Sequence, residues 1–220
     1  MSLNNYYYKL QKSTPACPCI DDYKGFNASP YLNDCDGVTT ITPTNGAFVN
    51  GSGFYEFDGI NDYLDDGSKI ESSIFTFSTW VNFDNINIDN RLMSYRLDGN
   101  NYLLVRLTVG NVFEIRYRSG VTATTGSFLS NLSYSAGTWY NFVVGIDGDN
   151  TVKMWVNGSP ITIQTISTGT RSTASAPHKI GGDDSRTMDG QMGQFKTSGC
   201  MLSDAEVLLN FNNQKSVYGL

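Results

Sequence analysis

The stretch Phe75–Phe83 constrains the fold of this 220-residue chain more than any other segment. Its sequence, FTFSTWVNF, alternates between two faces without a break. Successive side chains leave opposite faces of a strand, so a period of two predicts β-structure. One face carries only aromatic or β-branched residues: Phe75, Phe77, Thr79, Val81 and Phe83. We therefore predict a central strand of a hydrophobic core, and Trp80 indicates that the second face is also partly covered.

Short strands are expected to follow one another from about residue 46. The segments with strand character are 47–49, 54–57, 91–96, 102–109, 112–118, 139–146, 151–157, 161–166, 179–180 and 192–197. Turn residues separate them, as at Gly110-Asn111, which is typical of a hairpin. Near the end, Ser203 and Glu206 have the spacing of a capping box and predict a short helix. Many short strands with turn signals between them predict an antiparallel sandwich.

Residues 1–45 differ from the rest and are interpreted as an N-terminal arm, with a single domain over residues 46–220. This segment holds three of the four cysteines, three of the six prolines and the run Tyr6-Tyr7-Tyr8. Disordered segments are normally poor in aromatic residues, which argues against a solvated tail. We predict that the arm anchors the protein to a neighbouring subunit or to another copy of itself.

Composition and charge exclude several classes of function. The formal net charge is −6, which disfavours a nucleic-acid partner because phosphate binding relies on clustered Lys and Arg. No run approaches the roughly 18 apolar residues of a membrane span. The N-terminal residues lack a basic region followed by an apolar run, so no secretory signal is expected.

The four cysteines, Cys17, Cys19, Cys35 and Cys200, admit three complete pairings. Three of them lie close together in sequence, which raises the alternative of a zinc site. The chain has one histidine and no second Cys-x-Cys pair. Ordinary thiols or a local disulfide are therefore favoured over zinc.

Seven short motifs, in this order, resemble laminin-G-like domains of the concanavalin A-like lectin/glucanase superfamily. They are Phe57–Leu64 (FDGINDYL), Phe75–Val81, Gly137–Tyr140, Val152–Gly158 (VKMWVNG), Ile180–Gly182, Met188–Met192 and Leu202–Glu206. The resemblance covers about residues 46–215 and leaves out the arm. It implies an all-β fold: an antiparallel two-sheet jelly-roll sandwich, here with an irregular N-terminal arm and a short C-terminal helix.

The resemblance also implies a calcium site, because many relatives hold this ion at the turn that matches Asp58 and Asp62. Calcium takes six to eight oxygen ligands. The chain has Gly193 where the family often has an acidic residue, which removes one expected ligand. The alternative is that Asp58 and Asp62 form Asx-type turns without an ion.

We expect no enzymatic activity. Glycosidases on this fold need two carboxylates facing one cleft, and related enzymes carry them in an E-x-D-x-x-E motif that is missing here. The only histidine, His178, has no nucleophile elbow beside it.

Tyr95, Arg96, Arg106 and Trp155 are the candidate ligand-binding residues. Sugars are held by aromatic faces and by planar hydrogen-bonding groups, and Arg116 and Arg118 are expected near the same strands. The alternative is that the arginines cover an outward face with their alkyl stems while Trp155 packs between the sheets.

A lectin-like domain without an export signal favours a virion protein, which reaches the outside when the host cell lyses. We interpret the chain as a phage fibre, capsid decoration or tail component that contacts other virion subunits and binds a cell-surface glycan. The alternatives are a carbohydrate-binding module of a cell-surface or secreted protein, and a structural subunit without a ligand.

Overall fold

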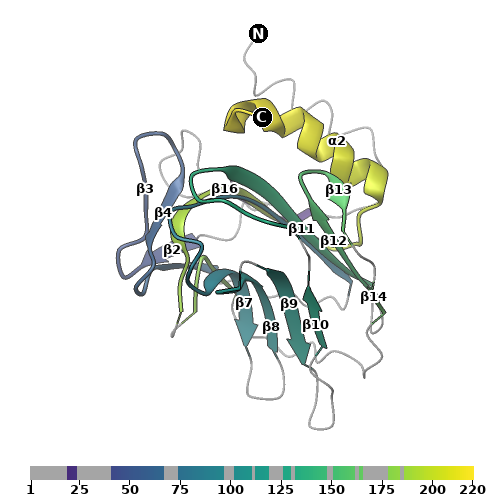
Figure 1. The fold of residues 1–220 in the computed structure, drawn as a ribbon, viewed down its shortest axis with the longest axis horizontal. Coiled ribbons are helices and arrows are strands. Elements are labelled where there is room, and N and C mark those ends of the chain that lie inside the picture. The colour runs from purple at the N-terminus through teal and green to yellow at the C-terminus, as the bar shows by residue number, and fades with distance from the viewer. Residues whose placement is uncertain are drawn as a thin grey trace.

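Two antiparallel sheets face each other, and a helix lies on the outside of one of them (Figure 1). The computed structural model describes residues 19–23, 41–66, 74–96, 102–110, 112–118, 126–129, 132–147, 151–161, 164–165, 178–183 and 186–220. The predicted all-β jelly-roll sandwich with a C-terminal helix is confirmed.

The first sheet has nine strands. They are β1 (Cys19–Tyr23), β3 (Phe48–Val49), β4 (Tyr55–Asp58), β6 (Phe75–Phe83), β11 (Trp139–Asp147), β12 (Thr151–Val156), β13 (Ser159–Pro160), β14 (Gln164–Thr165) and β16 (Asp189–Ser198). Seven of them follow the order β13-β12-β11-β6-β16-β4-β3, while β1 pairs with β16 and β14 with β12.

The second sheet has seven strands, in the order β10-β9-β8-β7-β15-β5-β2. They are β2 (Ile41–Thr44), β5 (Tyr63–Asp66), β7 (Asn90–Arg96), β8 (Tyr102–Leu107), β9 (Phe113–Arg118), β10 (Gly126–Leu129) and β15 (His178–Ile180). All of its pairings are antiparallel.

The predicted strand Phe75–Phe83 is β6, and it lies between β11 and β16 in the middle of the nine-stranded sheet. Its Phe75, Phe77, Val81 and Phe83 are fully buried between the two sheets. Alternate residues of β11 and β12 continue this core, which inward residues of β7, β8 and β9 close from the other side. The alternating pattern therefore identified the central strand and its buried face.

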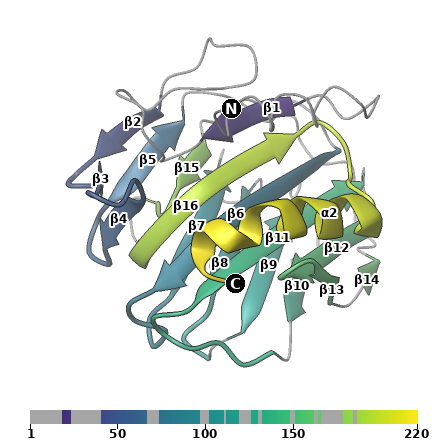
Figure 2. The same cartoon turned by 90° about the horizontal axis from the view of Figure 1, so that it is seen from above.

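The outer face of the nine-stranded sheet is covered by the C-terminal residues. The helix α2 (Asp204–Gln214) lies across this sheet and leads into the 3-10 helix η1 (Lys215–Tyr218) (Figure 2). The capping box of Ser203 and Glu206 is present, as predicted. Neither helix of the described chain is long and apolar enough to cross a membrane.

Two tryptophans on this outer face donate hydrogen bonds to the helix. The indole nitrogen of Trp80 donates to Gln214 Oε1 at 2.6 Å, and that of Trp155 donates to Asp204 Oδ1 at 3.0 Å. Tyr218 stacks on Trp80, with ring centroids 4.1 Å apart. Buried indole N–H groups need a partner, so α2 is fixed to the sheet by polar as well as apolar contacts.

Two strands from residues 1–45 belong to the sandwich itself. β1 pairs with the second half of β16, and β2 pairs with β5 at the end of the seven-stranded sheet. Cys200, just after β16, is disulfide-bonded, and the other cysteines of the sequence are Cys17, Cys19 and Cys35. Most residues of the predicted arm lie outside the described ranges, so its anchoring role stays a prediction.

Candidate functional site

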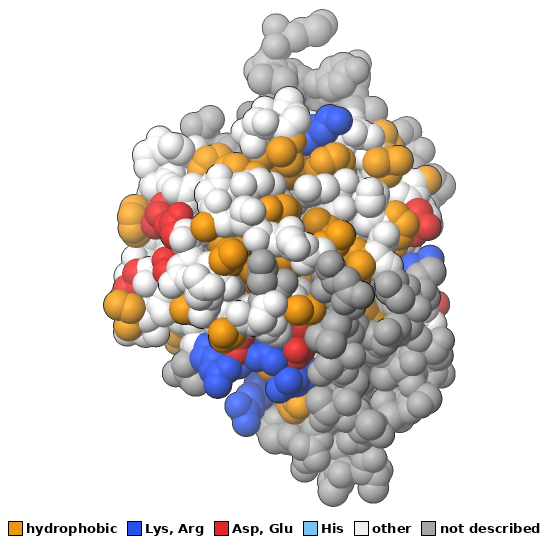
Figure 3. All heavy atoms as spheres, in the orientation of Figure 1, with side chains coloured by type: hydrophobic (Ala, Val, Ile, Leu, Met, Phe, Trp, Pro, Cys, Tyr) orange, Lys and Arg blue, Asp and Glu red, His pale blue; other side chains and the backbone are white. Residues whose placement is uncertain are grey.

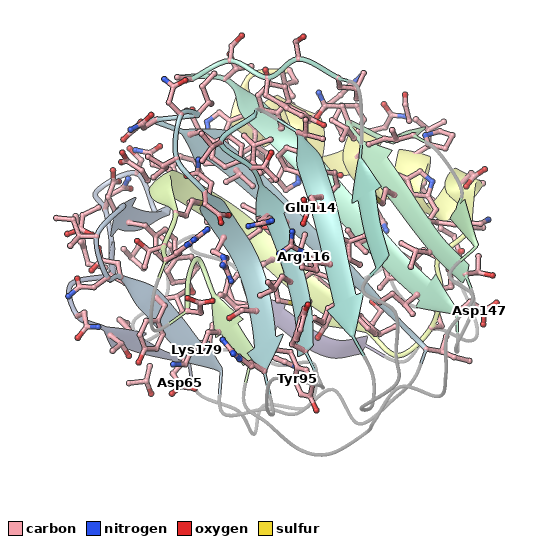
Figure 4. The ribbon with its side chains drawn as sticks, turned by 60° about the horizontal axis from the view of Figure 1, so that its bottom comes forward. Asp65, Tyr95, Glu114, Arg116, Asp147 and Lys179 are labelled. Atoms are coloured by element: carbon pink, nitrogen blue, oxygen red, sulfur yellow. The ribbon has the colours of Figure 1, made fainter. Side chains whose placement is uncertain are left out.

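The outward face of the seven-stranded sheet collects arginines and carboxylates. We define the arginine surface as Arg91, Arg96, Arg106, Arg116 and Arg186 together with Asp89, Glu114 and Asp183. Basic and acidic side chains gather in the lower half of Figure 3. In Figure 4 this face comes forward, and Glu114 and Arg116 lie over its middle strands.

The strand register explains why these residues meet. Arg91 lies opposite Arg106, and Arg106 lies opposite Glu114, so β7, β8 and β9 each contribute one charged residue to one row. A second row places Leu104 opposite Arg116. Directly opposite residues of antiparallel strands have Cβ atoms about 5 Å apart, which allows the ion pair of Arg106 with Glu114 in the first row.

Asp89, just before β7, is the acceptor on which three arginines converge. Its Oδ2 atom lies 2.5 Å from Nη1 of Arg106 and also accepts a hydrogen bond from Arg186. Its Oδ1 atom lies 3.7 Å from Nε of Arg91, whose Nη1 atom is 2.5 Å from Asp183. Burial lowers the pKa of Arg91, and the charges of Asp183 and Asp89 oppose this effect.

Glu114 is the second acceptor, shared by two arginines. Its Oε1 atom accepts from Nη2 of Arg106 at 2.9 Å and lies 3.1 Å from Nε of Arg116. Burial by itself lowers the pKa of Arg106, but the hydrogen bonds and charges of Glu114 and Asp89 outweigh it and raise the pKa. Arg106 is therefore held as a cation within the network.

A pocket of about 240 Å³ opens beside this network. It is lined by Arg91, Arg96, Tyr102, Leu104, Arg116 and Asp183. Arg96 lies opposite Tyr102 in the register. Arg96 is exposed, and the side chain of Arg116 is 38% exposed. Guanidinium groups and the half-buried phenol ring of Tyr102 thus meet at one place, beside the buried Leu104.

The sequence profile of the concanavalin A-like lectin/glucanases superfamily matches residues 58–208, more than half of the chain. The chain belongs to this superfamily. No sequence among the curated proteins matches it closely enough to be called a relative.

Several solved structures are similar to this chain in fold, although their sequence identity to it is low. Domain 4 of an extracellular arabinanase from Geobacillus stearothermophilus, in complex with arabinotriose, is 15% identical with a TM-score of 0.68; the match covers 87% of this chain and 97% of that domain. A CBM40 of a Ruminococcus gnavus sialidase, bound to α2,3-sialyllactose, is 11% identical with a TM-score of 0.62 and coverages of 72% and 96%.

The binding domain of botulinum neurotoxin serotype D is also similar, at 14% identity and a TM-score of 0.72. The match covers 90% of this chain but only 52% of that one, so this chain spans about half the length of the toxin domain. At these identities the likeness shows the fold.

Two of the predicted ligand-binding residues of the lectin-like domain do not lie on the arginine surface. Tyr95 is 2% exposed and belongs to the core, because a register shift between Arg91 and Met93 turns Tyr95 inward and Arg96 outward. Such a bulge reverses the faces of the residues that follow it. Trp155 is fully buried against α2, on the other sheet.

The other two predicted residues, Arg96 and Arg106, do lie on this surface, but only Arg96 is exposed. Sequence reasoning missed Asp89, Asp183 and Arg186, which lie outside the strands. Arg186 N–H donates to Asp183 Oδ1 at 2.9 Å, and Asp183 N–H donates to the carbonyl of Arg186 at 2.8 Å. Two aspartates before an arginine indicate a turn in the sequence, but only the fold brings Arg186 to Asp89.

The predicted calcium ligands lie in a turn that uses one oxygen of each carboxylate for the backbone, while the buried Asp62 Oδ1 accepts no hydrogen bond within the described residues. Asp62 Oδ2 accepts from Asp58 N–H at 3.0 Å, and Asp58 Oδ1 accepts from Ile60 N–H at 2.8 Å. Burial raises the pKa of Asp62. The backbone hydrogen bond from Asp58 opposes this effect, while the charge of Asp58 adds to it. Within the described ranges no group of three or more His, Cys, Asp or Glu residues is arranged to hold a metal. These residues fit Asx-type turns, and calcium stays an untested prediction.

Proposed function

We propose that this chain is a non-enzymatic glycan-binding module that holds its ligand on the arginine surface. The observation that carries the proposal is the pocket over β7, β8 and β9, where Arg96 and Arg116 flank Tyr102 and Leu104. The outer face of the other sheet is covered by α2 and η1, whereas the outward face of the seven-stranded sheet carries this pocket.

The chemistry of the pocket suits a sugar. A sugar ring has apolar C–H faces and hydroxyl edges, so it needs an apolar or aromatic contact and planar hydrogen-bonding groups. Tyr102 and Leu104 supply the first, and the guanidinium groups with Asp183 supply the second. The ion pairs of Arg91 and Arg106 fix the wall of the pocket before a ligand arrives, which lowers the ordering cost of binding.

The carboxylates of this surface are poorly placed for glycoside hydrolysis. That chemistry needs one carboxylic acid and one free carboxylate on opposite sides of the bond that is cleaved. Asp89, Glu114 and Asp183 each pair with at least one arginine, so all three carboxylates are already engaged within the network. A binding role therefore accounts for the site better than an enzymatic one.

For the setting, we propose display outside the cell, either on a virus particle or as a module of a secreted or cell-surface protein. The arabinanase domain similar to this chain comes from an extracellular enzyme, which supports the extracellular setting in general. Immunogold labelling of particles from the source would separate the two: labelled particles support the virion role, and unlabelled particles with labelled cell surface or medium support the module.

The test of the binding function is a glycan array probed with the purified full chain, once with calcium and once with a chelator. We expect selective binding to a limited group of glycans. Loss of that binding with chelator would restore the calcium site at Asp58 and Asp62. An array without signal in both conditions would overturn the proposal and favour a structural subunit.

A further inference from the structure

We infer that the ligand of the arginine surface is an acidic glycan, a chain with sugars that carry a carboxylate or sulfate group. This inference rests on the proposed function and names the class of sugar. Its basis is the distribution of charge. The five arginines whose side chains the structure describes all belong to the arginine surface, although the chain has a formal net charge of −6.

The carboxylates of the surface do not balance these cations. Five arginines face three acids, Asp89, Glu114 and Asp183, an excess of two positive charges among the described groups. Asp89 is shared by three arginines and Glu114 by two. A local excess of one sign in a partly enclosed site attracts ligands of the opposite sign.

The excess is found where a ligand can reach it. Arg91 and Arg106 are nearly buried and engaged in the network. Arg96 is exposed and has no ion pair with a described residue, and Arg116 shares its only described acid, Glu114, with Arg106. The guanidinium groups of Arg96 and Arg116 are thus the two that retain hydrogen-bonding capacity toward the pocket.

The geometry matches an acidic sugar unit. Arg96 and Arg116 lie on strands two positions apart, roughly 10 Å at the usual strand spacing. Between them, the half-buried Tyr102 offers a surface for the apolar face of a sugar ring, with Leu104, which is 9% exposed, beside it. A guanidinium binds planar anions through two parallel N–H donors, so either arginine can hold the acidic group while the ring lies on Tyr102 and Leu104.

The experiment is a calorimetric comparison of matched glycans. Oligogalacturonate is compared with its methyl ester, and a sulfated heparin oligosaccharide with its desulfated form, each with the full chain at low and at physiological salt. We expect the charged member of at least one pair to bind at least about tenfold more tightly than its neutral partner. Binding should weaken as salt rises, because the attraction is screened. The preferred pair shows whether carboxylate or sulfate is recognised.

Three variants locate the site. Arg96→Gln and Arg116→Gln should each weaken binding of the acidic glycan by about tenfold. Lys153→Gln removes one positive charge from the opposite sheet, where Lys153 lies 4.0 Å from Asp204, and should leave affinity unchanged. Folding of each variant is checked by its unfolding temperature.

The outcomes separate the two claims. Equal binding of charged and neutral partners would overturn the acidic class while the glycan-binding function stands. Acidic-glycan binding that both Arg96→Gln and Arg116→Gln leave intact would overturn the arginine surface as the place where the ligand is held. Absence of binding to any glycan, here and on the array, would overturn both.

Discussion

The hydroxyl of Tyr218 lies directly over Gly193, where an added Cβ would come within 2.4 Å of it. The same hydroxyl accepts the N–H of Gln194 at 3.0 Å. Gly193 is the position at which relatives often carry an acidic residue, and its lack of a side chain lets the end of the chain close over β16.

Replacement of Gly193 by alanine should destabilise the fold. The ring of Tyr218 packs against Trp80, Trp139 and Phe54 and has little room to move away. Overpacking of this kind typically costs about 1–3 kcal/mol. Urea denaturation should show that loss in the free energy of unfolding. Gly51→Ala is the control, since nothing lies within 4 Å of a Cβ at that position.

The Tyr218→Ala background tests the cause. Without the ring, Gly193→Ala should cost much less than in the wild type, and a double-mutant cycle measures that coupling. Equal cost in both backgrounds would show that the destabilisation does not come from Tyr218.

Replacement of Asp89 by asparagine should be costly because the arginines around it lose their shared carboxylate. Asp89 is 9% exposed, and removal of one partner from a buried ion pair typically costs about 3–5 kcal/mol. Thermal unfolding should show a large drop. The control is Asp147, which is exposed at the end of β11 and lies at the right edge of Figure 4. Asp147→Asn should change the free energy of unfolding by less than about 0.5 kcal/mol. Similar values for the two variants would mean that the network contributes little.

Two carboxyl groups should give opposite pH dependence of stability. Burial, with the charges of Asp84 and Asp58, raises the pKa of Asp189, although a hydrogen bond with Asn85 opposes this. Its contribution to the free energy of unfolding is fully present below about pH 4, the ordinary value for Asp, and is lost as the pH rises through the raised pKa. Hydrogen bonds from Ser203 lower the pKa of Glu206. Its contribution is present at pH 7 and is lost as the pH falls through the lowered pKa.

Denaturation at pH 3 and pH 7 checks these signs. Relative to wild type, Asp189→Asn should become more stable between pH 3 and pH 7, while Glu206→Gln should become less stable over the same interval. The same direction for both variants would contradict the assignment.

Removal of residues 1–23 should destabilise the sandwich, because β1 is one of its strands. Tyr23 lies opposite Phe195 and Cys19 opposite Ser198, so this half of β16 would lose its partner on one side. An exposed strand edge invites association with other chains. We expect a lower unfolding temperature and concentration-dependent aggregation by light scattering. Unchanged stability with loss of assembly would instead support a separate anchoring arm.

Much of the fold was predictable from the sequence because short-range patterns carry it. The alternation of Phe75–Phe83 identified a central strand that is buried on one face and covered by a helix on the other. Ser203 and Glu206 identified the start of that helix. In both cases the signal lies within a few residues, where periodicity and capping are visible.

The site was less predictable because it depends on register. One shift in β7 decides that Tyr95 faces the core and Arg96 faces the pocket, and nothing in the local pattern marks it. The partners of Arg106 come from the segment before β7 and from β9, and Arg186 is 97 residues away from Asp89 in sequence. Long-range pairings of this kind appear only when β7, β8, β9 and β15 are paired in register.

The cover that α2 and η1 form over the nine-stranded sheet has a consequence for valency. With one sheet face closed by α2 and η1, the proposed glycan site of the described sandwich is a single one, on the seven-stranded sheet. In that proposal several copies held at a spacing that matches a repeating polysaccharide gain strength over one copy through effective concentration. Firm attachment then becomes a property of how many copies are displayed together.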